Sequence, residues 1–438
     1  MRKKALKKRD LYLKRMIGFQ DTEMIKVITG IRRCGKSSLM KLMAQHLLEN
    51  GISEEQILEM NFESMSLPEM DARSFYQYVK ERILPDKRMY LFFDEIQKIP
   101  GWENAVNSFR VDFDCDIYIT GSNAYLLSSE LSTYLSGRYV EIKVYPLSFR
   151  EFLDFHGYVV TERKSPVGRS KKRIEDIEGE IYDVRELYTA YTRFGGMPLL
   201  ADIGLEIDKV AAALDGVYSA AVVNDILERE KRKGRRTITD AILLRKIIMF
   251  LADNIGNNTS ATSIKNSLAN EGLLDNGVRK TKPAVQTIQT YIEALTEAYI
   301  FYEIKRFDIK GKEYLRTLGK YYIADIGLRN YLLGYREGDS GHILENIIYV
   351  ELLRQGYDVA IGKIDTQEVD FIATSADKKL YIQVTGSMSS PETRERELAP
   401  LRKIRDNFEK IVITLEGDEK LTDDGIKIMN ALDFLFVL

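Results

Sequence analysis

Near its N-terminus the chain reads Gly30-Ile31-Arg32-Arg33-Cys34-Gly35-Lys36-Ser37, which fits the phosphate-binding pattern G-x-x-x-x-G-K-[ST]. A β-branched apolar run, 24–29, precedes this loop, and a segment with helical periodicity, 38–48, follows it. Strand, glycine loop and helix form the setting that phosphate binding requires, because backbone N–H groups can then close around phosphate oxygens. The sequence therefore predicts a nucleotide-binding loop, or P-loop, at this position.

The polar residues of this loop have expected roles. Lys36 should reach the β- and γ-phosphates, and Ser37 should be a ligand of Mg²⁺. We therefore expect ATP and Mg²⁺ to bind here. The guanine-reading pattern N-K-x-D is not evident, which leaves the choice of ATP over GTP open. Further contacts with the nucleotide are expected from Gly30, Arg33, Cys34, Gly35 and Ser38.

A second motif lies at 89–95, where an apolar run ends in the carboxylates of Asp94 and Glu95. A fully apolar run is typical of a central parallel strand that is covered on both faces. Its C-terminal end lies at the edge of the sheet where α/β proteins bind ligands. We expect Asp94 to hold Mg²⁺ through water and Glu95 to polarise the attacking water. The alternative is a strand that merely ends in acidic residues.

The composition is that of a soluble globular protein with several domains. The chain has 438 residues, 45% of them hydrophobic and 30% charged. Its 64 basic residues nearly balance its 66 acidic residues, so net charge gives no general argument for nucleic-acid binding. The two cysteines, Cys34 and Cys115, cannot form a disulfide framework, which favours a reducing compartment. No signal peptide, membrane span or metal-ligand cluster is evident, so we expect a cytoplasmic protein.

Strands and helices alternate from about 25 to 155, which predicts an α/β fold with a parallel sheet. Further strands are expected at 56–62, 116–120 and 139–144. The order of P-loop, Asp-Glu strand and a strand ending in Thr-Gly-Ser-Asn resembles the AAA+ branch of P-loop ATPases. The resemblance implies that Asn123, or Ser122, contacts the γ-phosphate or the attacking water. Either residue could instead cap the next helix.

Two phrases, 135–139 and 145–152, resemble a narrower family, the prokaryotic AAA-type ATPases that carry a DUF4143 C-terminal region. In this family context, Arg138 is expected to meet the developing phosphate charge, in the same chain or in a neighbouring copy. A surface salt bridge is its alternative role. The break Gly195-Gly196-Met197-Pro198 resembles the G-x-P element of STAND-type ATPases, which implies that Pro198 packs near the adenine. A plain turn explains the break equally well.

The chain after the ATPase core, which is expected to occupy 1–158, divides into smaller parts. Residues 159–185 are predicted to be a basic loop or linker, and 186–236 a helical lid. Between 237 and 330, three helices and a strand pair resemble a winged helix-turn-helix. The exposed face of its third helix is polar but not basic, which favours a lid or a protein contact over reading DNA. This face would carry Gln286, Gln289, Thr290 and Glu293.

The region 338–438 resembles the α/β core of PD-(D/E)XK nucleases. Glu345 on a helix and Asp370 on a β segment match the acids that hold Mg²⁺ in such enzymes. Gln383 and Thr385 stand where the family has Glu and Lys. Because Gln383 lacks the charge of a carboxylate and Thr385 cannot replace an ammonium, the resemblance implies a nuclease-like fold with an inactive site.

Basic residues are concentrated in three runs, at 2–15, 163–173 and 229–236. Such runs can neutralise phosphates and bind nucleic acid, but solvated loops and tails are the simpler explanation. Only Tyr12 within these runs could stack on a base. The runs are therefore a weak indication of a nucleic-acid partner.

Together these features predict a slow ATPase that acts as a molecular switch, with the C-terminal domains coupling nucleotide state to a partner. One alternative is an ATP-gated nuclease or DNA-processing protein, which Gln383 and Thr385 disfavour. Another is a module that holds nucleotide without turnover, which Glu95 disfavours. The partner, the pathway and the oligomeric state are left open by the sequence.

Overall fold

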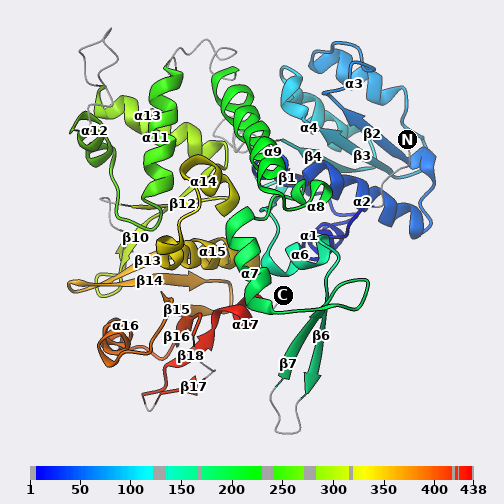
Figure 1. Ribbon diagram of the computed structural model, residues 1–438. Helices are drawn as coiled ribbons and strands as arrows, with labels where there is room; N and C mark the ends of the chain where they lie inside the picture. The colour runs from blue at the N-terminus through cyan, green and yellow to red at the C-terminus, as the bar shows by residue number, and fades with distance from the viewer. Residues whose placement is uncertain are drawn as a thin grey trace. The chain divides into compact units, whose positions relative to one another are not determined.

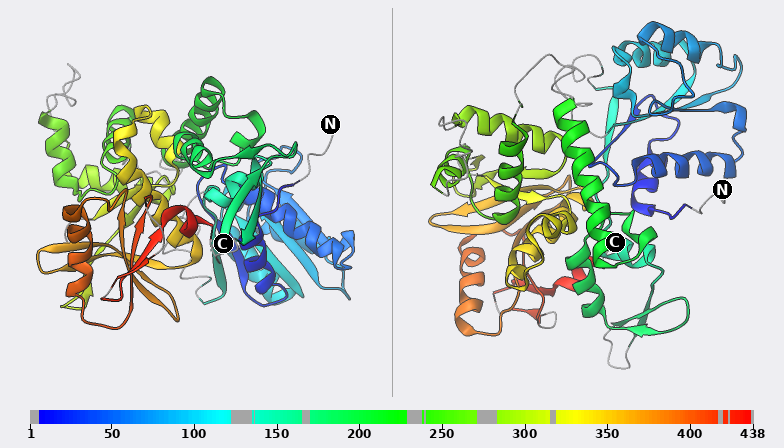
Figure 2. Two further views of the ribbon diagram at one scale, coloured as in Figure 1. Left: turned by 60° about the horizontal axis from the view of Figure 1, so that its bottom comes forward. Right: turned by 45° about the horizontal axis from the view of Figure 1, so that its top comes forward.

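The computed structural model describes residues 6–436 apart from 122–134, 136, 165–169, 229–237, 239, 271–282, 315–318, 417–419 and 423. The chain divides into two compact units. The first consists of Met1–Tyr145 and the short segment Glu297–Tyr299, and the second of Pro146–Thr296 and Ile300–Leu438. Figures 1 and 2 show the helices and strands of both units.

The first unit is built on a parallel sheet with the strand order β2-β3-β4-β1-β5. All five strands lie where the sequence predicts them, which confirms the α/β fold with a parallel sheet. The strands are β1 (Ile25–Thr29), β2 (Ile57–Asn61), β3 (Met89–Asp94), β4 (Cys115–Thr120) and β5 (Tyr139–Lys143). The helices are α1 (Asp10–Gly18), α2 (Lys36–Glu49), α3 (Ala72–Lys80) and α4 (Trp102–Asp112), with short 3₁₀ turns at Glu54–Gln56 and Ile96–Lys98.

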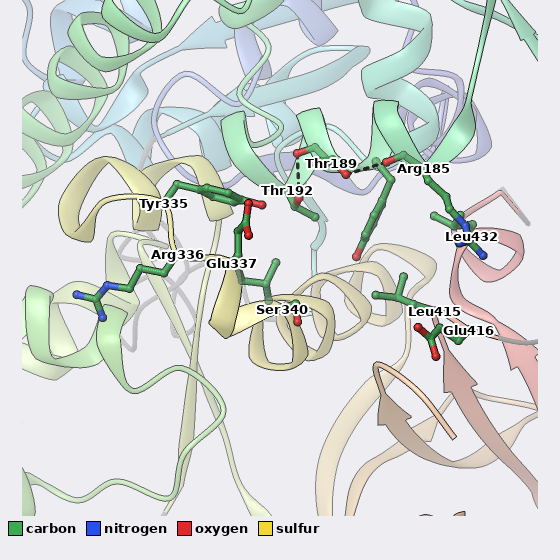
Figure 3. A pocket seen from close by; sticks show the side chains of 12 residues that line it. Arg185, Thr189, Thr192, Tyr335, Arg336, Glu337, Ser340, Leu415, Glu416 and Leu432 are labelled. Atoms are coloured by element: carbon green, nitrogen blue, oxygen red, sulfur yellow. Dashed lines mark hydrogen bonds between the residues drawn. The ribbon is translucent and has the colours of Figure 1, made fainter. Parts of the chain in front are cut away.

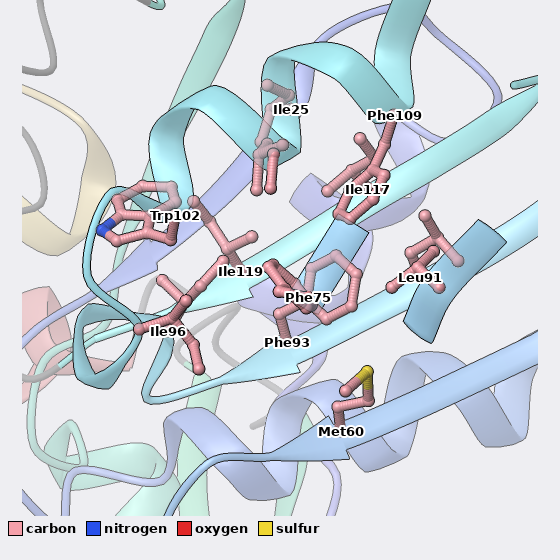
Figure 4. Packing of buried hydrophobic residues seen from close by; sticks show 14 of the residues in the cluster. Ile25, Met60, Phe75, Leu91, Phe93, Ile96, Trp102, Phe109, Ile117 and Ile119 are labelled. Carbon is pink, nitrogen blue, oxygen red and sulfur yellow. The ribbon is translucent and has the colours of Figure 1, made fainter. Parts of the chain in front are cut away.

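Apolar side chains of the sheet, α3 and α4 form the core on one face of this sheet (Figure 4). Phe75 of α3 lies edge-on to Phe93 of β3 and to Phe109 of α4, with ring centroids 5.0 and 5.2 Å apart. Each such aromatic pair contributes about 0.5–1.5 kcal/mol beyond the burial of its area. This packing fixes β3, and with it the carboxylates at its end.

The carboxyl ends of the parallel strands all meet at one edge of the sheet. The P-loop leaves β1 there, Asp94 ends β3 and Thr120 ends β4. Because β4 lies between β1 and β3, the end of β4 separates the P-loop from the acidic pair. The order of the strands therefore assembles the predicted site residues from distant parts of the sequence.

The second unit begins with helices and a hairpin sheet of the order β6-β7-β8. Its first elements are α6 (Phe149–Phe155), β6 (Val159–Lys164), β7 (Ser170–Glu175), β8 (Ile181–Tyr182), α7 (Val184–Phe194), α8 (Leu200–Ile203), α9 (Ile207–Ser219) and a π-helix at Ala220–Glu228. Residues 163–173 were predicted to be a loop, and this prediction is wrong for the part that the structure describes. The hairpin pairs Val159 with Glu175 and Arg163 with Lys171, and such backbone pairing outweighs a basic composition that reads as loop.

Three helices and a pair of antiparallel strands follow, as the sequence predicts. They are α11 (Ala241–Asp253), α12 (Ala261–Asn270), α13 (Val285–Glu297), β9 (Phe301–Ile304) and β12 (Lys320–Ile323). On α13, Gln286 and Glu293 are exposed, and Gln289 and Thr290 are partly exposed, which agrees with the expected polar face. Whether these elements act as a winged helix stays a prediction.

The C-terminal part of the second unit is a mixed sheet of the order β11-β10-β13-β14-β15-β16-β18-β17. Its strands are β10 (Arg306–Asp308), β11 (Glu313–Tyr314), β13 (Asp358–Ile364), β14 (Gln367–Thr374), β15 (Lys379–Thr385), β16 (Glu409–Thr414), β17 (Lys420–Leu421) and β18 (Lys427–Asn430). The helices are α14 (Ile326–Leu333), α15 (Ser340–Gln355), α16 (Pro391–Lys403) and α17 (Ala431–Leu435), and a 3₁₀ turn spans Glu337–Asp339. Among the described residues, no helix is both long and apolar enough to span a membrane.

Candidate nucleotide site and acidic cluster

The P-loop turns sharply from β1 into α2, and its two glycines make the turn possible. Gly30 has φ +137°, and a Cβ at this position would lie 2.1 Å from the backbone oxygen of Val144. Gly35, at φ +102°, precedes α2 directly. Since residues with a Cβ rarely adopt such angles, both glycines are required by the backbone itself. The N-terminal end of α2 therefore opens onto the loop, as anion binding needs.

Lys36 is folded back over the loop. Its ammonium donates hydrogen bonds to the carbonyls of Gly30 at 2.9 Å and Ile31 at 3.2 Å, and the residue is buried. Ser37 is half-buried in the first turn of α2, whereas Arg33 and Ser38 are exposed. The loop thus holds one ammonium and a helix end where the sequence predicts phosphate binding.

An arginine outside the motif donates a hydrogen bond to the backbone of the P-loop. Arg9 is buried, and its guanidinium donates to the carbonyl oxygen of Cys34 at 2.9 Å and lies 4.5 Å from the ring centre of Tyr12. Tyr12 is itself fully buried, and its hydroxyl accepts a hydrogen bond from the backbone N–H of Tyr145. Tyr12 is therefore part of the core and does not offer a ring for stacking on a base, as the basic run had suggested.

The acidic pair at the end of β3 is held by its neighbours on both sides. Asp94 is buried and accepts hydrogen bonds from the Thr120 hydroxyl and from the side-chain amide of Asn61 at 3.1 Å. The N–H of Glu95 donates to the same hydroxyl of Thr120 at 3.1 Å. Glu95 has φ +57°, an uncommon angle for a residue with a side chain, and its carboxylate accepts from Gln97 at 2.5 Å. This network fixes the directions of the two carboxylates relative to each other.

The structure adds Thr120 and Asn61 to the residues predicted from sequence. Both are the last residues of their strands, and a polar residue at a strand's carboxyl end was the signal that could have found them. Ser122 and Asn123, predicted to contact the γ-phosphate or the water, lie outside the described residues. Their roles stay predictions.

Arg138 lies at the edge of the sheet opposite to the P-loop. Its carbonyl accepts from the N–H of Ile25, the first residue of β1, and its exposed guanidinium donates to Asn107 at 3.1 Å. The P-loop begins after the last residue of β1, at the other end of this strand. At about 3.3 Å per residue, it lies about 16 Å from Ile25. Action of Arg138 on the nucleotide of its own chain is therefore not supported by this placement, and action on a second copy stays a proposal.

The Gly-Gly-x-Pro break belongs to the second unit. There the N–H of Gly196 donates to Asp325 at 2.6 Å, and its carbonyl accepts from the N–H of Leu147 at 2.6 Å. Burial raises the pKa of Asp325 to about 6, although hydrogen bonds from backbone N–H groups oppose this shift. The break therefore has a packing role, and a contact of Pro198 with adenine stays a proposal.

The predicted nuclease-like residues come together in the second unit. Asp370 on β14 accepts a hydrogen bond from the N–H of Val384 at 2.8 Å, and its own N–H donates to the side-chain oxygen of Gln383 at 3.3 Å. Burial and the carboxylate of Glu345 on α15 raise the pKa of Asp370 well above its ordinary value. Thr385, in contrast, donates to the Ser387 carbonyl in the turn that follows β15. Glu345, Glu368 and Asp370 form what we term the acidic cluster.

Lys320 of β12 supplies the acidic cluster with a cation. Its ammonium lies 3.1 Å from Glu345 and 2.8 Å from Glu368, and its side chain is 6% exposed. Burial lowers the pKa of Lys320, but the carboxylates of Glu345, Asp370 and Glu368 outweigh this effect and raise it above its ordinary value. The lysine therefore carries a full charge among the acids. In the described part of the chain, no three His, Cys, Asp or Glu side chains are arranged to hold a metal ion.

Comparison with known proteins places the chain in a family. Over 436 residues it is 40% identical to an uncharacterized protein of Haemophilus influenzae, and the match covers 99% of both chains. The chain belongs to the family of this Haemophilus protein. An uncharacterized protein of Methanocaldococcus jannaschii is 29% identical over 415 residues, which cover 91% of this chain and 84% of that protein.

Two domain models match parts of the chain. Residues 22–153 match the family described as "AAA domain", and this segment contains the P-loop and the acidic pair. The chain therefore carries an AAA domain. Residues 185–339 match a domain of unknown function, DUF8612, in a region where resemblance had suggested DUF4143. Among solved structures, the Walker-type ATPase of Pyrococcus abyssi is 15% identical with a TM-score of 0.49, covering 76% of this chain and 97% of that one.

A hollow of about 270 Å³ in the second unit lies between α7 and the start of α15 (Figure 3). Several polar side chains line it, and three of them are already engaged. The hydroxyls of Thr189 and Thr192 donate to carbonyls of their own helix, and Arg336 pairs with Asp253 at 2.7 Å. We therefore assign no ligand to this hollow.

Proposed function

We propose that this protein binds and slowly hydrolyses ATP and that its nucleotide state is relayed to a partner through the second unit. The observation that carries the proposal is the convergence of the P-loop, Asp94 and Glu95 on one edge of the sheet within an AAA domain. Purified protein incubated with ATP and Mg²⁺ should release phosphate continuously. Absence of both ATP binding and phosphate release would reject the proposal.

The residues present fit ATP with Mg²⁺. Lys36, which now rests on loop carbonyls, would turn its ammonium to the phosphates, and the end of α2 would direct N–H groups at them. Ser37 and Asp94 would hold Mg²⁺, which offsets the charge on the phosphate oxygens. Glu95 would orient the attacking water and accept its proton. The Thr120 hydroxyl, which bonds to both the Asp94 carboxylate and the Glu95 backbone N–H, would hold the two acids in position for these roles.

A short segment of the chain supports the relay of nucleotide state. Glu297–Tyr299 belongs to the first unit, whereas the chain on both sides of it belongs to the second. Tyr299 is buried at φ +55°, and its hydroxyl donates to Glu141 at 3.2 Å. The hydroxyl of Thr29, the residue before the P-loop, donates to the same Glu141 oxygen at 2.5 Å. Tyr299 is thus joined through one carboxylate to the strand that carries the P-loop.

We expect Tyr299→Phe to weaken this relay without destroying nucleotide binding. In the native chain, binding of a non-hydrolysable ATP analogue should change hydrogen exchange in the segment 285–304. Because the variant loses the bond to Glu141, we expect less than about half of that change. Tyr314→Phe, at an exposed position, is the matched control. An unaltered nucleotide-dependent change in Tyr299→Phe would remove Tyr299 from the relay.

We further propose that the C-terminal part has a nuclease-like fold but does not cut DNA. Gln383 and Thr385 stand where the nuclease family has its Glu and Lys, and Lys320 forms ion pairs with Glu345 and Glu368. A cation held by two ion pairs is not readily displaced, since removing one partner leaves uncompensated buried charge. The acidic cluster would then fasten β12 to the large sheet.

Incubation with supercoiled, linear and single-stranded DNA tests this assignment. We expect no cleavage with Mg²⁺ or Mn²⁺, whether or not ATP is present, because no metal-ligand set is assembled in the described part of the chain. Cleavage that disappears in Asp370→Ala would contradict the proposal and favour an ATP-gated nuclease. Cleavage that survives this substitution would arise from another site or from a contaminant.

A further inference from the structure

A basic hollow of about 700 Å³ lies in the second unit, apart from the acidic cluster. It is formed by the turn after β10, the end of β13 and the C-terminal end of α16, elements that lie on the left of Figure 1. Two carboxylates, Asp365 and Asp406, also line it. Its cations come from distant parts of the sequence and are Lys310, Lys312, Arg402, Lys403 and Arg405.

Part of this positive charge is already neutralised. Lys310 pairs with Asp365 at 2.5 Å, and Arg402 pairs with Glu395 at 2.6 Å and Asp424 at 2.5 Å. Asp406 accepts a hydrogen bond from the hydroxyl of Tyr381 at 2.5 Å. The pKa of Asp365 is held below its ordinary value by the hydrogen bond from Lys310 and also by the charge of Lys403. The printed ion pairs of Lys310 and Arg402 do not include the other cations of the hollow.

Three cations of the basic hollow are free to meet an external anion. Lys312, Lys403 and Arg405 are exposed, and none of them has an ion-pair partner within the described ranges of the chain. The whole chain has a formal net charge of −2, so this concentration of free positive charge stands out. Clustered lysine and arginine side chains of this kind contact successive phosphates of a nucleic acid.

Two exposed aromatic residues lie close in the chain to residues of the basic hollow. Phe408 is 50% exposed, and its backbone N–H donates to Asp406 of the basic hollow at 3.3 Å. Tyr314, two residues after Lys312, is 55% exposed and lies edge-on to Phe307, with ring centroids 5.2 Å apart. The ammonium of Lys379 lies 5.2 Å from the centre of the Phe408 ring. Exposed rings that are close in the chain to the cations of the hollow suit a ligand that has both anionic and flat apolar groups.

We propose that the basic hollow binds single-stranded nucleic acid. Lys312, Lys403 and Arg405 contact its phosphates, and Tyr314 and Phe408 stack on its bases. An acidic peptide would use the cations but would offer no flat base to the exposed rings. A duplex keeps its bases stacked inside, so it would gain from the phosphates alone.

Fluorescence anisotropy of labelled oligonucleotides tests this proposal with the full chain. We expect a mixed-sequence single strand to bind at about 50 mM salt and to bind more weakly at about 200 mM, because phosphate contacts release counterions. The combined variant Lys312→Glu/Lys403→Glu/Arg405→Glu should weaken binding about fivefold or more and flatten the salt dependence. The control, Lys41→Glu/Lys80→Glu/Lys87→Glu, reverses three exposed lysines outside the basic runs and should bind like the native chain. Circular dichroism checks that both variants are folded.

A second variant separates stacking from charge. Tyr314→Ala/Phe408→Ala should weaken binding of the single strand more than binding of a duplex of the same sequence, because only the single strand offers its bases. Equal loss for both substrates would overturn the stacking part of the proposal. Native-like binding by the charge-reversed variant would show that the nucleic acid does not bind at the basic hollow. Binding of polyglutamate but of no oligonucleotide would assign the basic hollow to an acidic protein and reject the proposal.

Discussion

Replacement of Glu95 by Gln should lower the rate of ATP hydrolysis by a factor on the order of a hundred or more while ATP remains bound. This is the usual contribution of a general base. Gln has nearly the shape of Glu. The hydrogen bond from the backbone N–H of Glu95 to the Thr120 hydroxyl does not involve the Glu95 side chain, so the substitution preserves it. The substitution therefore removes the charge and basicity that activate water and leaves the P-loop intact.

Phosphate release and calorimetric titration with ATP should be measured on the same preparation. Glu69→Gln, an exposed acid of the first unit, is the matched control and should hydrolyse ATP at the native rate. Hydrolysis by Glu95→Gln at the native rate would show that Glu95 is not the base. The proposed switch would then have no identified residue that activates the attacking water. A loss of ATP binding equal to the loss of turnover would assign Glu95 to binding.

Replacement of Lys36 by Ala should weaken ATP binding by at least about tenfold, which is about 1.4 kcal/mol. The lysine ammonium offsets phosphate charge, and it donates hydrogen bonds to the carbonyls of Gly30 and Ile31 in the loop. Its loss removes the cation nearest to the phosphates. It also leaves these two carbonyls without their donor.

Calorimetry of ATP binding measures this effect, with Lys41→Ala on the exposed face of the same helix as the control. Thermal unfolding separates the two consequences of losing Lys36. If the loop requires the lysine for its shape, the melting temperature falls together with affinity, whereas a pure charge effect leaves it unchanged. Unchanged affinity in Lys36→Ala would reject the assignment of the P-loop.

Much of the first unit could be predicted from the sequence because its signals are local. The backbone angles at Gly30 and Gly35 require glycine. The apolar run that ends in Asp94 predicts a buried strand. The roles of Ser122 and Asn123 were also inferred from a local pattern, and they stay predictions. The hairpin at 159–175 was missed, since its strands are stabilised by each other and their basic composition resembles a loop.

The sequence by itself determined the chemistry that the nucleotide site can offer, because the P-loop spacing and the acidic pair are each contiguous in the chain. Only the tertiary structure decided which distant residues act beside them. Arg9 reaches the P-loop, Tyr299 joins its strand, and Arg138 falls at the opposite edge of the sheet. Likewise, Lys320 enters the acidic cluster from a separate pair of strands. The physical reason is that ion pairs and hydrogen bonds act over a few ångströms in space, whatever the separation of their partners in sequence.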